Sequence, residues 1–189
     1  ESRYLVVSRR GVIVPTIGSL EAILDIARVV YYPGPLEGFL LERYGLSLDA
    51  GQWRALRAEF GLGAEDPVEV KDGQIDALAP LLRRLEPEIR AVAERERAAM
   101  MRYLDEAGLL QALSVAVVDV GYSGTIQNYL NRLTRRPVNG YYLMTDGKVQ
   151  RVCDEHAVVA RGAYHDRVAG DEALPPMYRY SFELEKLLS

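Results

Sequence analysis

The sequence predicts an α/β fold in which a parallel β-sheet carries a helical insertion between its first and central strands. Residues 115–118, Val-Ala-Val-Val, form a short apolar run that is typical of a strand buried on both faces of such a sheet. A similar run occupies residues 4–7, and much of the chain between the two runs has apolar residues at helical spacing. Because crossovers between parallel strands are right-handed, we expect both strands to lie in one sheet.

The composition is that of an ordinary globular protein, and it limits the classes of function. The chain has 189 residues, of which 49% are hydrophobic and 26% charged, which suits one α/β domain with an insertion. A net charge of −4 argues against a nucleic-acid partner. The single cysteine, Cys153, excludes an internal disulfide and fits a reducing compartment such as the cytoplasm. No apolar run approaches the ~20 residues of a membrane span.

The helical insertion is delimited by capping residues such as Ser19, before its first helix, and Gly45, after its second. The predicted helices are residues 20–30, 36–44, 49–61, 75–85 and 87–108. We therefore divide the chain into an α/β core, residues 1–19 and 112–189, and a helical hood, residues 20–111. Since the chain opens almost directly on a predicted strand, we expect it to be a fragment of a longer multidomain protein.

A helix and further strands are predicted after the central strand. Apolar residues at helical spacing follow Thr125, and either Ser123 or Thr125 is expected to cap this helix. The pair Asp146-Gly147 lies between two strand-like runs and predicts a β-hairpin. The remaining predicted elements are strands at 139–145, 148–153 and 157–164, a polar loop at 166–176 and a closing helix at 182–188.

The turn after the central strand has the composition of an anion-binding site. The N–H groups at a helix start and the positive end of the helix dipole together bind phosphate. The turn does not match Gly-x-x-x-x-Gly-Lys or Gly-x-Gly-x-x-Gly, and Thr125 breaks the nucleophile elbow Gly-x-Ser-x-Gly. The alternative reading is an ordinary helix cap. The candidate site residues are Asp119, Gly121, Tyr122, Ser123, Gly124 and Thr125.

Arg9 and Arg10 follow the first predicted strand and form a second candidate anion contact. An arginine guanidinium grips phosphate oxygens bidentately. In a parallel sheet, ligands bind beyond the carboxyl ends of the strands, so these arginines and Asp119 are expected to face one pocket. The alternative is a solvated basic turn.

Residues 115–125 resemble the phosphoribosyl pyrophosphate (PRPP) motif of type I phosphoribosyltransferases, a hydrophobic strand with two acids, three residues and then Thr-Gly-x-Thr. In a gapless alignment, Asp119 takes the place of the second acid, Ser123 that of the first Thr and Gly124 that of the Gly. Val118 stands in the place of the first acid, and Thr125 falls one position early.

A closer resemblance covers both ends of the chain. Tyr-Leu-Val-Val-Ser-Arg-Arg at 4–10 and Asp-Val-Gly-Tyr-Ser-Gly-Thr-Ile-Gln at 119–127 are similar to a glycan phosphoribosyltransferase domain found with haloacid-dehalogenase-type phosphatases in bacterial surface-polysaccharide biosynthesis. The resemblance implies a phosphoribosyltransferase-like core and a glycosyltransferase that moves 5-phosphoribosyl from PRPP to a sugar hydroxyl of a growing glycan, such as an O antigen or capsule. A phosphatase domain or partner would then remove the 5-phosphate to leave ribofuranose. Because the glycan acceptor would be lipid-linked or free, the resemblance implies that the protein acts in the cytoplasm or at the inner face of the membrane.

The resemblance also implies roles for the site residues. The 5-phosphate would bind the loop at 121–125, and Asp119 would bind the ribose hydroxyls and favour an oxocarbenium-like centre. Arg9 or Arg10, with Mg²⁺, would neutralise the leaving pyrophosphate, and the hood would supply the acceptor surface. No metal ligand is assigned. The candidate general bases, by residue type alone, are Asp146, Asp154, Glu155, His156, His165 and Asp166.

Two other classes of function stay open. The same fold could be a non-catalytic module that binds a phosphorylated glycan or docks a phosphatase, and Val118 in the place of the first acid favours that reading. A serine hydrolase with Ser123 as the nucleophile is the third class, and it lacks the complete elbow motif.

Overall fold

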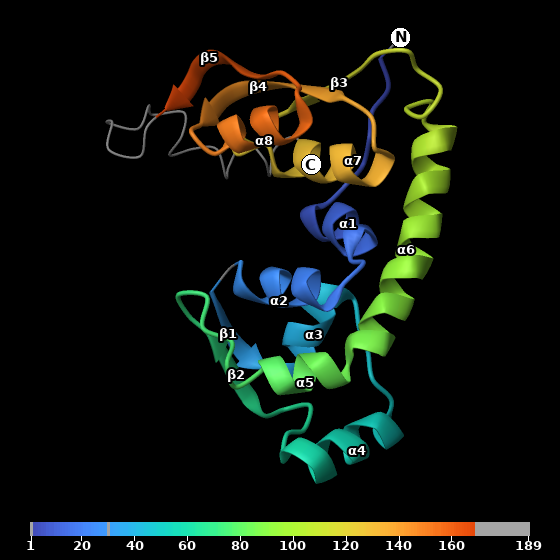
Figure 1. Cartoon of the computed structure of the whole chain (residues 1–189), viewed down its shortest axis with the longest axis vertical. Coiled ribbons are helices and arrows are strands. Elements are labelled where there is room, and N and C mark those ends of the chain that lie inside the picture. Colours follow the sequence, from blue (N-terminus) through green and yellow to red (C-terminus); the bar gives the residue numbers. More distant parts are fainter. Residues whose placement is uncertain (1, 30, 169–189) are drawn as a thin grey trace. The chain divides into compact units, whose positions relative to one another are not determined.

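The computed structural model describes residues 2–29 and 31–168, and the chain divides into two compact units (Figure 1). Residues 10–100 form one unit, here called the helical unit, and residues 1–9 and 101–189 form the other, the sheet unit. The boundaries fall within α1 (Arg9–Ile13) and α6 (Glu86–Glu106). They differ from the sequence-based boundaries at residues 19/20 and 111/112.

The helical unit contains short helices and a two-stranded antiparallel ribbon, in which β1 pairs with β2. The ribbon was not predicted, because its strands of four residues carry Pro and Gly, which are typical of turns. Besides parts of α1 and α6, the elements are η1 (Val14–Thr16), α2 (Leu20–Arg28), β1 (Tyr32–Pro35), α3 (Leu36–Tyr44), α4 (Ala50–Phe60), β2 (Pro67–Val70) and α5 (Ala79–Arg84).

Capping residues set the helix ends in this unit, as predicted. The Ser19 hydroxyl accepts a hydrogen bond from the Ala22 N–H at 3.2 Å and starts α2. Asp49 and Gln52 form a reciprocal capping box at the start of α4. Gly45 ends α3 with a φ of 65°, a left-handed conformation that glycine adopts without steric cost. Local side-chain chemistry therefore determines these boundaries.

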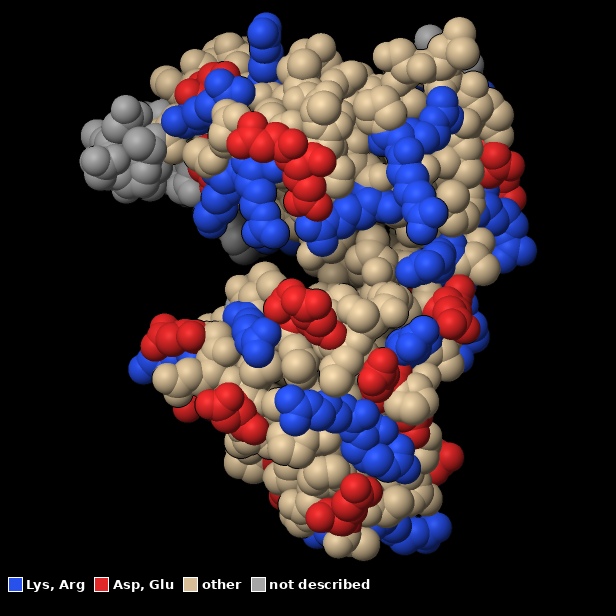
Figure 2. Space-filling model, in the orientation of Figure 1, with Lys and Arg blue, Asp and Glu red and all other residues tan. Residues whose placement is uncertain are grey.

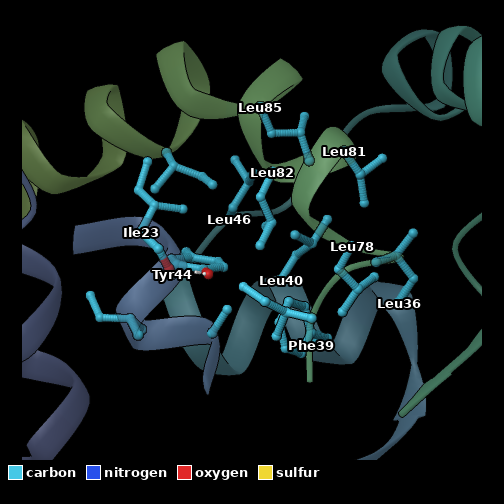
Figure 3. Close-up of a cluster of buried hydrophobic side chains, with 14 of the residues drawn as sticks. Ile23, Leu36, Phe39, Leu40, Tyr44, Leu46, Leu78, Leu81, Leu82 and Leu85 are labelled. Carbon is cyan, nitrogen blue, oxygen red and sulfur yellow. Dashed lines mark hydrogen bonds between the residues drawn. The ribbon is translucent and has the colours of Figure 1, made fainter. Parts of the chain in front are cut away.

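The core of the helical unit is built mainly from leucines of α3, α5 and the segments beside them (Figure 3). Tyr44 is fully buried among them, and its hydroxyl donates to the Ile23 carbonyl oxygen at 2.8 Å, so its polar atom is satisfied. The Phe39 ring meets the Tyr44 ring edge-on at a centroid distance of 6.1 Å. This unit thus has a hydrophobic core of its own.

The sheet unit is a three-stranded parallel sheet in the order β3-β4-β5. Both connections are helical, and α7 and α8 lie on the same face of the sheet (Figure 1). Gln127 and Leu130 of α7, and Val149 and Val152 of α8, are buried on that face. The elements are β3 (Val115–Asp119), α7 (Thr125–Thr134), β4 (Val138–Asp146), α8 (Val149–His156) and β5 (Ala160–Val168).

The predicted α/β class and the central strand-to-helix unit are confirmed, but the burial of the central strand is not. Within the described residues β3 is an edge strand, and Val118 is 87% exposed. Tyr141, its neighbour on β4, is 47% exposed. The side chains of Val118 and Tyr141 lie on the face opposite the two helices, so this parallel strand is not buried on both faces.

The prediction of a first strand at residues 4–7 was wrong. Residues 2–8 form neither helix nor strand, and α1 begins at Arg9. The Val6 N–H donates to the Tyr103 hydroxyl on α6 at 2.8 Å, a contact that replaces strand pairing at that group. Tyr4 and Val6 are 77% and 71% exposed. The hydrophobic run at residues 4–7 therefore has the composition of a strand but does not pair with a strand of the sheet.

The predicted hairpin at Asp146-Gly147 was also wrong. Residues 149–156 form α8, and β5 then pairs with β4 in parallel rather than antiparallel orientation. The predicted strand at 148–153 is thus helical, whereas the strands at 139–145 and 157–164 correspond to β4 and β5. The closing helix at 182–188, and the polar loop beyond residue 168, lie outside the described residues.

Across residues 2–29 and 31–168, each helix is too short or too polar to cross a lipid bilayer.

Candidate functional site

The candidate site lies at the carboxyl edge of the parallel sheet, where β3 ends at Asp119 and β4 ends at Asp146. Here we call residues 120–124, between β3 and α7, the central loop. Because parallel neighbours end at the same edge, the fold brings this loop beside the end of β4. The Asp146 N–H donates to the Tyr122 carbonyl oxygen at 3.0 Å and fixes the two segments together.

Asp119 shapes the first half of the central loop. Its Oδ1 accepts a hydrogen bond from the Gly121 N–H at 3.0 Å, which turns the chain immediately after β3. A Cβ at position 121 would lie 3.1 Å from Asp119 Oδ2. Glycine at this position therefore leaves room for the carboxylate, which is half-buried at the strand end.

Gly124 is the N-cap of α7, so the prediction that Ser123 or Thr125 would cap the helix was wrong. Its φ is 67°, and a Cβ there would lie 3.3 Å from both Val149 Cγ1 and Val152 Cγ2 on α8. The first helical bond runs from Asn128 N–H to the Gly124 carbonyl oxygen at 2.9 Å. Helix geometry leaves the N–H groups of residues 125–127 without an intrahelical acceptor, as an anion site at a helix start requires.

The Ser123 hydroxyl binds a carboxylate at the end of the neighbouring strand. Ser123 Oγ donates to Asp146 Oδ2 at 2.7 Å, while Asp146 Oδ1 accepts from the Lys148 N–H at 2.8 Å. Asp146 is 9% exposed, so this is a largely buried carboxylate with protein donors on both oxygens. Asp146 is therefore a candidate general base that contacts the central loop directly, through the Ser123 hydroxyl.

A buried polar network that the sequence analysis missed holds α7 against the sheet. The Gln127 Nε2 donates to the carbonyl oxygens of Val138 and Val159, each at 2.8 Å, and its Oε1 accepts from the Tyr142 hydroxyl at 2.8 Å. Burial, and secondarily the nearby Asp119 charge, raise the pKa of Tyr142, so this hydroxyl stays protonated. The sequence signal for this network was a glutamine on the face of α7 that packs against the sheet. Periodicity of apolar residues does not detect it, because glutamine is polar.

Arg9 and Arg10 do not follow a strand of the sheet, which removes the basis for placing them at its carboxyl edge. Arg9 begins α1 and is exposed. Arg10 belongs to the helical unit, where its Nη1 pairs with Glu96 Oε1 at 2.8 Å. This ion pair borders a cavity of about 610 Å³, whose other lining residues are Leu41, Glu42 and Gly45.

The remaining candidate bases are held in other contacts. The Asp166 carboxylate accepts from the Thr145 hydroxyl at 2.6 Å, a hydrogen bond that lowers the Asp166 pKa. His156 Nε2 lies 2.6 Å from Asn128 Oδ1, and Glu155 forms an ion pair with Arg132. The Ser123 hydroxyl therefore donates to a carboxylate, not to a histidine as a Ser-His pair would require. Asp154 Oδ1 accepts from Gln150 at the surface of α8, and His165 lies exposed on β5.

The sheet unit is the more basic half of the chain. Over its full sequence this unit has twelve Lys and Arg side chains against twelve Asp and Glu, whereas the helical unit has eleven against fifteen. On the face of this unit that Figure 2 shows, basic side chains stand in several places among mostly uncharged surface. In the part of the chain that the structure describes, no group of three or more His, Cys, Asp or Glu is arranged to hold a metal ion.

Comparison with protein-family models, with curated proteins and with solved structures gave no significant match to this chain. The resemblance to glycan phosphoribosyltransferases is thus a prediction that depends on the two motifs quoted above.

Proposed function

We propose that the sheet unit binds PRPP at the carboxyl edge of its sheet and transfers the 5-phosphoribosyl group to a sugar hydroxyl of a surface glycan. One observation carries the proposal above the others. The central loop joins a parallel strand that ends in Asp119 to the start of α7, so a carboxylate and unpaired helix N–H groups stand on one short loop.

The donor would bind through two kinds of contact. Its 5-phosphate would accept hydrogen bonds from the N–H groups of residues 123–127, assisted by the positive end of the α7 dipole. The ribose hydroxyls would donate to Asp119. Because the Ser123 hydroxyl already donates to Asp146, the loop amides rather than this hydroxyl are the main phosphate donors in the proposal.

The reaction is a substitution at the anomeric carbon of ribose. The bond from that carbon to pyrophosphate breaks, the bond to the acceptor oxygen forms, and the proton of the acceptor hydroxyl is released. Positive charge develops on the ribose as pyrophosphate leaves, and the Asp119 carboxylate would stabilise that charge.

Mg²⁺ fits this proposal without a cage of protein ligands. The ion usually keeps several waters and binds one or two carboxylates together with substrate phosphates, and Asp119 is the half-buried carboxylate that ends β3 at this edge. Bound with the donor, the ion would neutralise charge on the pyrophosphate. The acceptor surface is assigned to the helical unit by the resemblance alone.

Calorimetric titration of PRPP with Mg²⁺ into the chain, beside Asp119→Asn, tests the proposal. An asparagine oxygen still accepts from the Gly121 N–H, so this variant removes charge and keeps the turn. Saturable binding that is lost in the variant supports a donor site and justifies a screen of glycan acceptors. Absence of binding in a well-folded sample would contradict it.

The second candidate function is a non-catalytic module that binds a phosphorylated glycan or docks a phosphatase. Two observations favour it: Val118 is an exposed strand residue in the place of an acid, and Arg10 is paired with Glu96 in the other unit. Binding of a phosphorylated sugar, without PRPP binding or transfer, would decide for this module.

A further inference from the structure

We infer that Asp146 is the positioning residue of the proposed donor site: it holds the central loop in its anion-binding conformation through the Ser123 hydroxyl. The inference rests on the proposed function for its effect on the donor, but its effect on the loop can be measured independently. This role also distinguishes Asp146 from the other candidate general bases.

Three hydrogen bonds of Asp146 tie two loops to the end of β4. Its N–H donates to the Tyr122 carbonyl oxygen at 3.0 Å, and its Oδ2 accepts from Ser123 Oγ at 2.7 Å. Its Oδ1 accepts from the Lys148 N–H at 2.8 Å, immediately before α8. One residue therefore fixes the middle of the central loop and the turn that follows β4.

The loop needs such a support because β3 is an edge strand among the described residues and Gly124 has a left-handed conformation. Glycine at position 124 carries no side chain that could hold the helix start, and glycine has more conformational freedom than any other residue in the unfolded chain. The Ser123 contact lies one residue before Gly124, so it restrains the backbone where its N–H groups must converge on a phosphate.

The same contacts argue against a role for Asp146 as the general base. A base must reach the proton of the acceptor hydroxyl, whereas each Asp146 oxygen already accepts a protein hydrogen bond and the residue is 9% exposed, which leaves little access for that hydroxyl. The Ser123 hydroxyl has one proton, and donating it to Asp146 leaves that hydroxyl able only to accept from a ligand. Ser123 and Asp146 thus act as one structural pair.

The test uses Ser123→Ala, Asp146→Ala and the double variant, with loop hydrogen exchange and PRPP titration as readouts. Each single change should speed amide exchange of residues 121–126 about tenfold and weaken PRPP binding by a similar factor. The double variant should be no worse than Asp146→Ala alone, because that change already removes the contact with Ser123 together with the one to the Lys148 N–H. Thr134→Ala is the matched control, since it removes a hydroxyl bond of 2.8 Å at the other end of α7.

Asp146→Asn keeps the variant folded and separates the roles. The asparagine oxygen can accept from the Lys148 N–H while its NH2 group donates to Ser123 Oγ, so both contacts persist and we expect loop exchange within about threefold of the parent chain. Loss of transfer with unchanged donor affinity and unchanged loop exchange would make Asp146 a base and overturn the inference. Unchanged loop exchange in Asp146→Ala would overturn it as well. If loop exchange responds as expected but the parent chain does not bind PRPP, the positioning role stands and the proposed function fails.

Discussion

Gly124→Ala is the substitution for which the structure allows the most complete calculation. The residue is the N-cap of α7, has a φ of 67° and is buried against α8. An added Cβ would lie 3.3 Å from a methyl carbon of Val149 and 3.3 Å from one of Val152. Two independent costs therefore act at one position.

The first cost is conformational, because an L-residue in the left-handed region loses roughly 1–2 kcal/mol. The second is steric. Overpacking of a well-filled site costs about 1–3 kcal/mol, and both valines belong to the packed interface between α7 and α8, at 0% and 4% exposure. We expect the free energy of unfolding of the sheet unit to fall by about 2–5 kcal/mol, which at roughly 4 °C per kcal/mol for a unit of this size is a Tm lower by ~8–20 °C.

Urea denaturation followed by circular dichroism measures this loss, and two other glycines serve as controls. Gly147→Ala adds a Cβ with no heavy atom within 4 Å, in the turn after β4, and should change stability by less than ~0.5 kcal/mol. Gly61→Ala combines a φ of 71° with open space, so it should show only the conformational cost in the helical unit. A Gly124→Ala variant as stable as Gly147→Ala would refute both the left-handed cap and the packing on α8.

Three further predictions follow from single contacts. Gly121→Ala should weaken PRPP binding about tenfold with little loss of stability, because its Cβ would lie 3.1 Å from an Asp119 oxygen; equal titrations would contradict this. Gln127→Leu should lower the free energy of unfolding by about 1–3 kcal/mol, because it leaves the buried Tyr142 hydroxyl without its acceptor, whereas the Val138 and Val159 carbonyl oxygens each keep a second donor. Asp166→Asn tests pH dependence. The Thr145 hydrogen bond lowers the folded-state pKa of Asp166, so its stabilisation is present above the unfolded-state pKa of about 4 and lost as pH falls through the folded value. The stability gap between parent and variant should shrink on acidification, and a gap that does not change between about pH 7 and pH 3 would contradict the assignment.

The sequence predicted the helical unit well where local chemistry determines the structure. The bounds of α3 and α4 follow directly from Gly45, Asp49 and Gly61, each of which acts within one helical turn. The ribbon of β1 and β2 escaped prediction because its pairing joins residues more than thirty positions apart, as Tyr32 with Val70 does. Turn residues within a strand cannot reveal such a partner.

The errors in the sheet unit have the same origin. Residues 4–7 and 148–153 have the composition of strands, but the first contacts α6 and the second forms a helix that covers the sheet. Whether an apolar run becomes a strand depends on a neighbour with free hydrogen-bonding groups, which lies elsewhere in the chain. An Asp-Gly pair likewise suits the start of a helical crossover as well as a hairpin.

The candidate site was found in the sequence only as far as it is local. Asp119 and the loop to Thr125 could be identified from a strand, a glycine-rich turn and a helix in succession. The bond from Ser123 to Asp146 spans 23 positions and depends on two parallel strands ending at one edge. Sequence reasoning placed Asp146 among six candidates by residue type, and only the fold distinguishes it.

Most residues of the central loop have a structural role that needs no ligand. Gly124 permits the left-handed cap, Ser123 binds Asp146, and Gly121 leaves space for a carboxylate. Their presence therefore fits a plain strand-to-helix turn as well as a phosphate site. Asp119 differs, because the turn requires only an oxygen that accepts from the Gly121 N–H, and an asparagine would supply one. Ribose hydroxyls and a developing positive charge benefit from the full carboxylate. A donor site is thus distinguished from a helix cap by what the loss of that one charge does to binding and turnover while the loop keeps its shape.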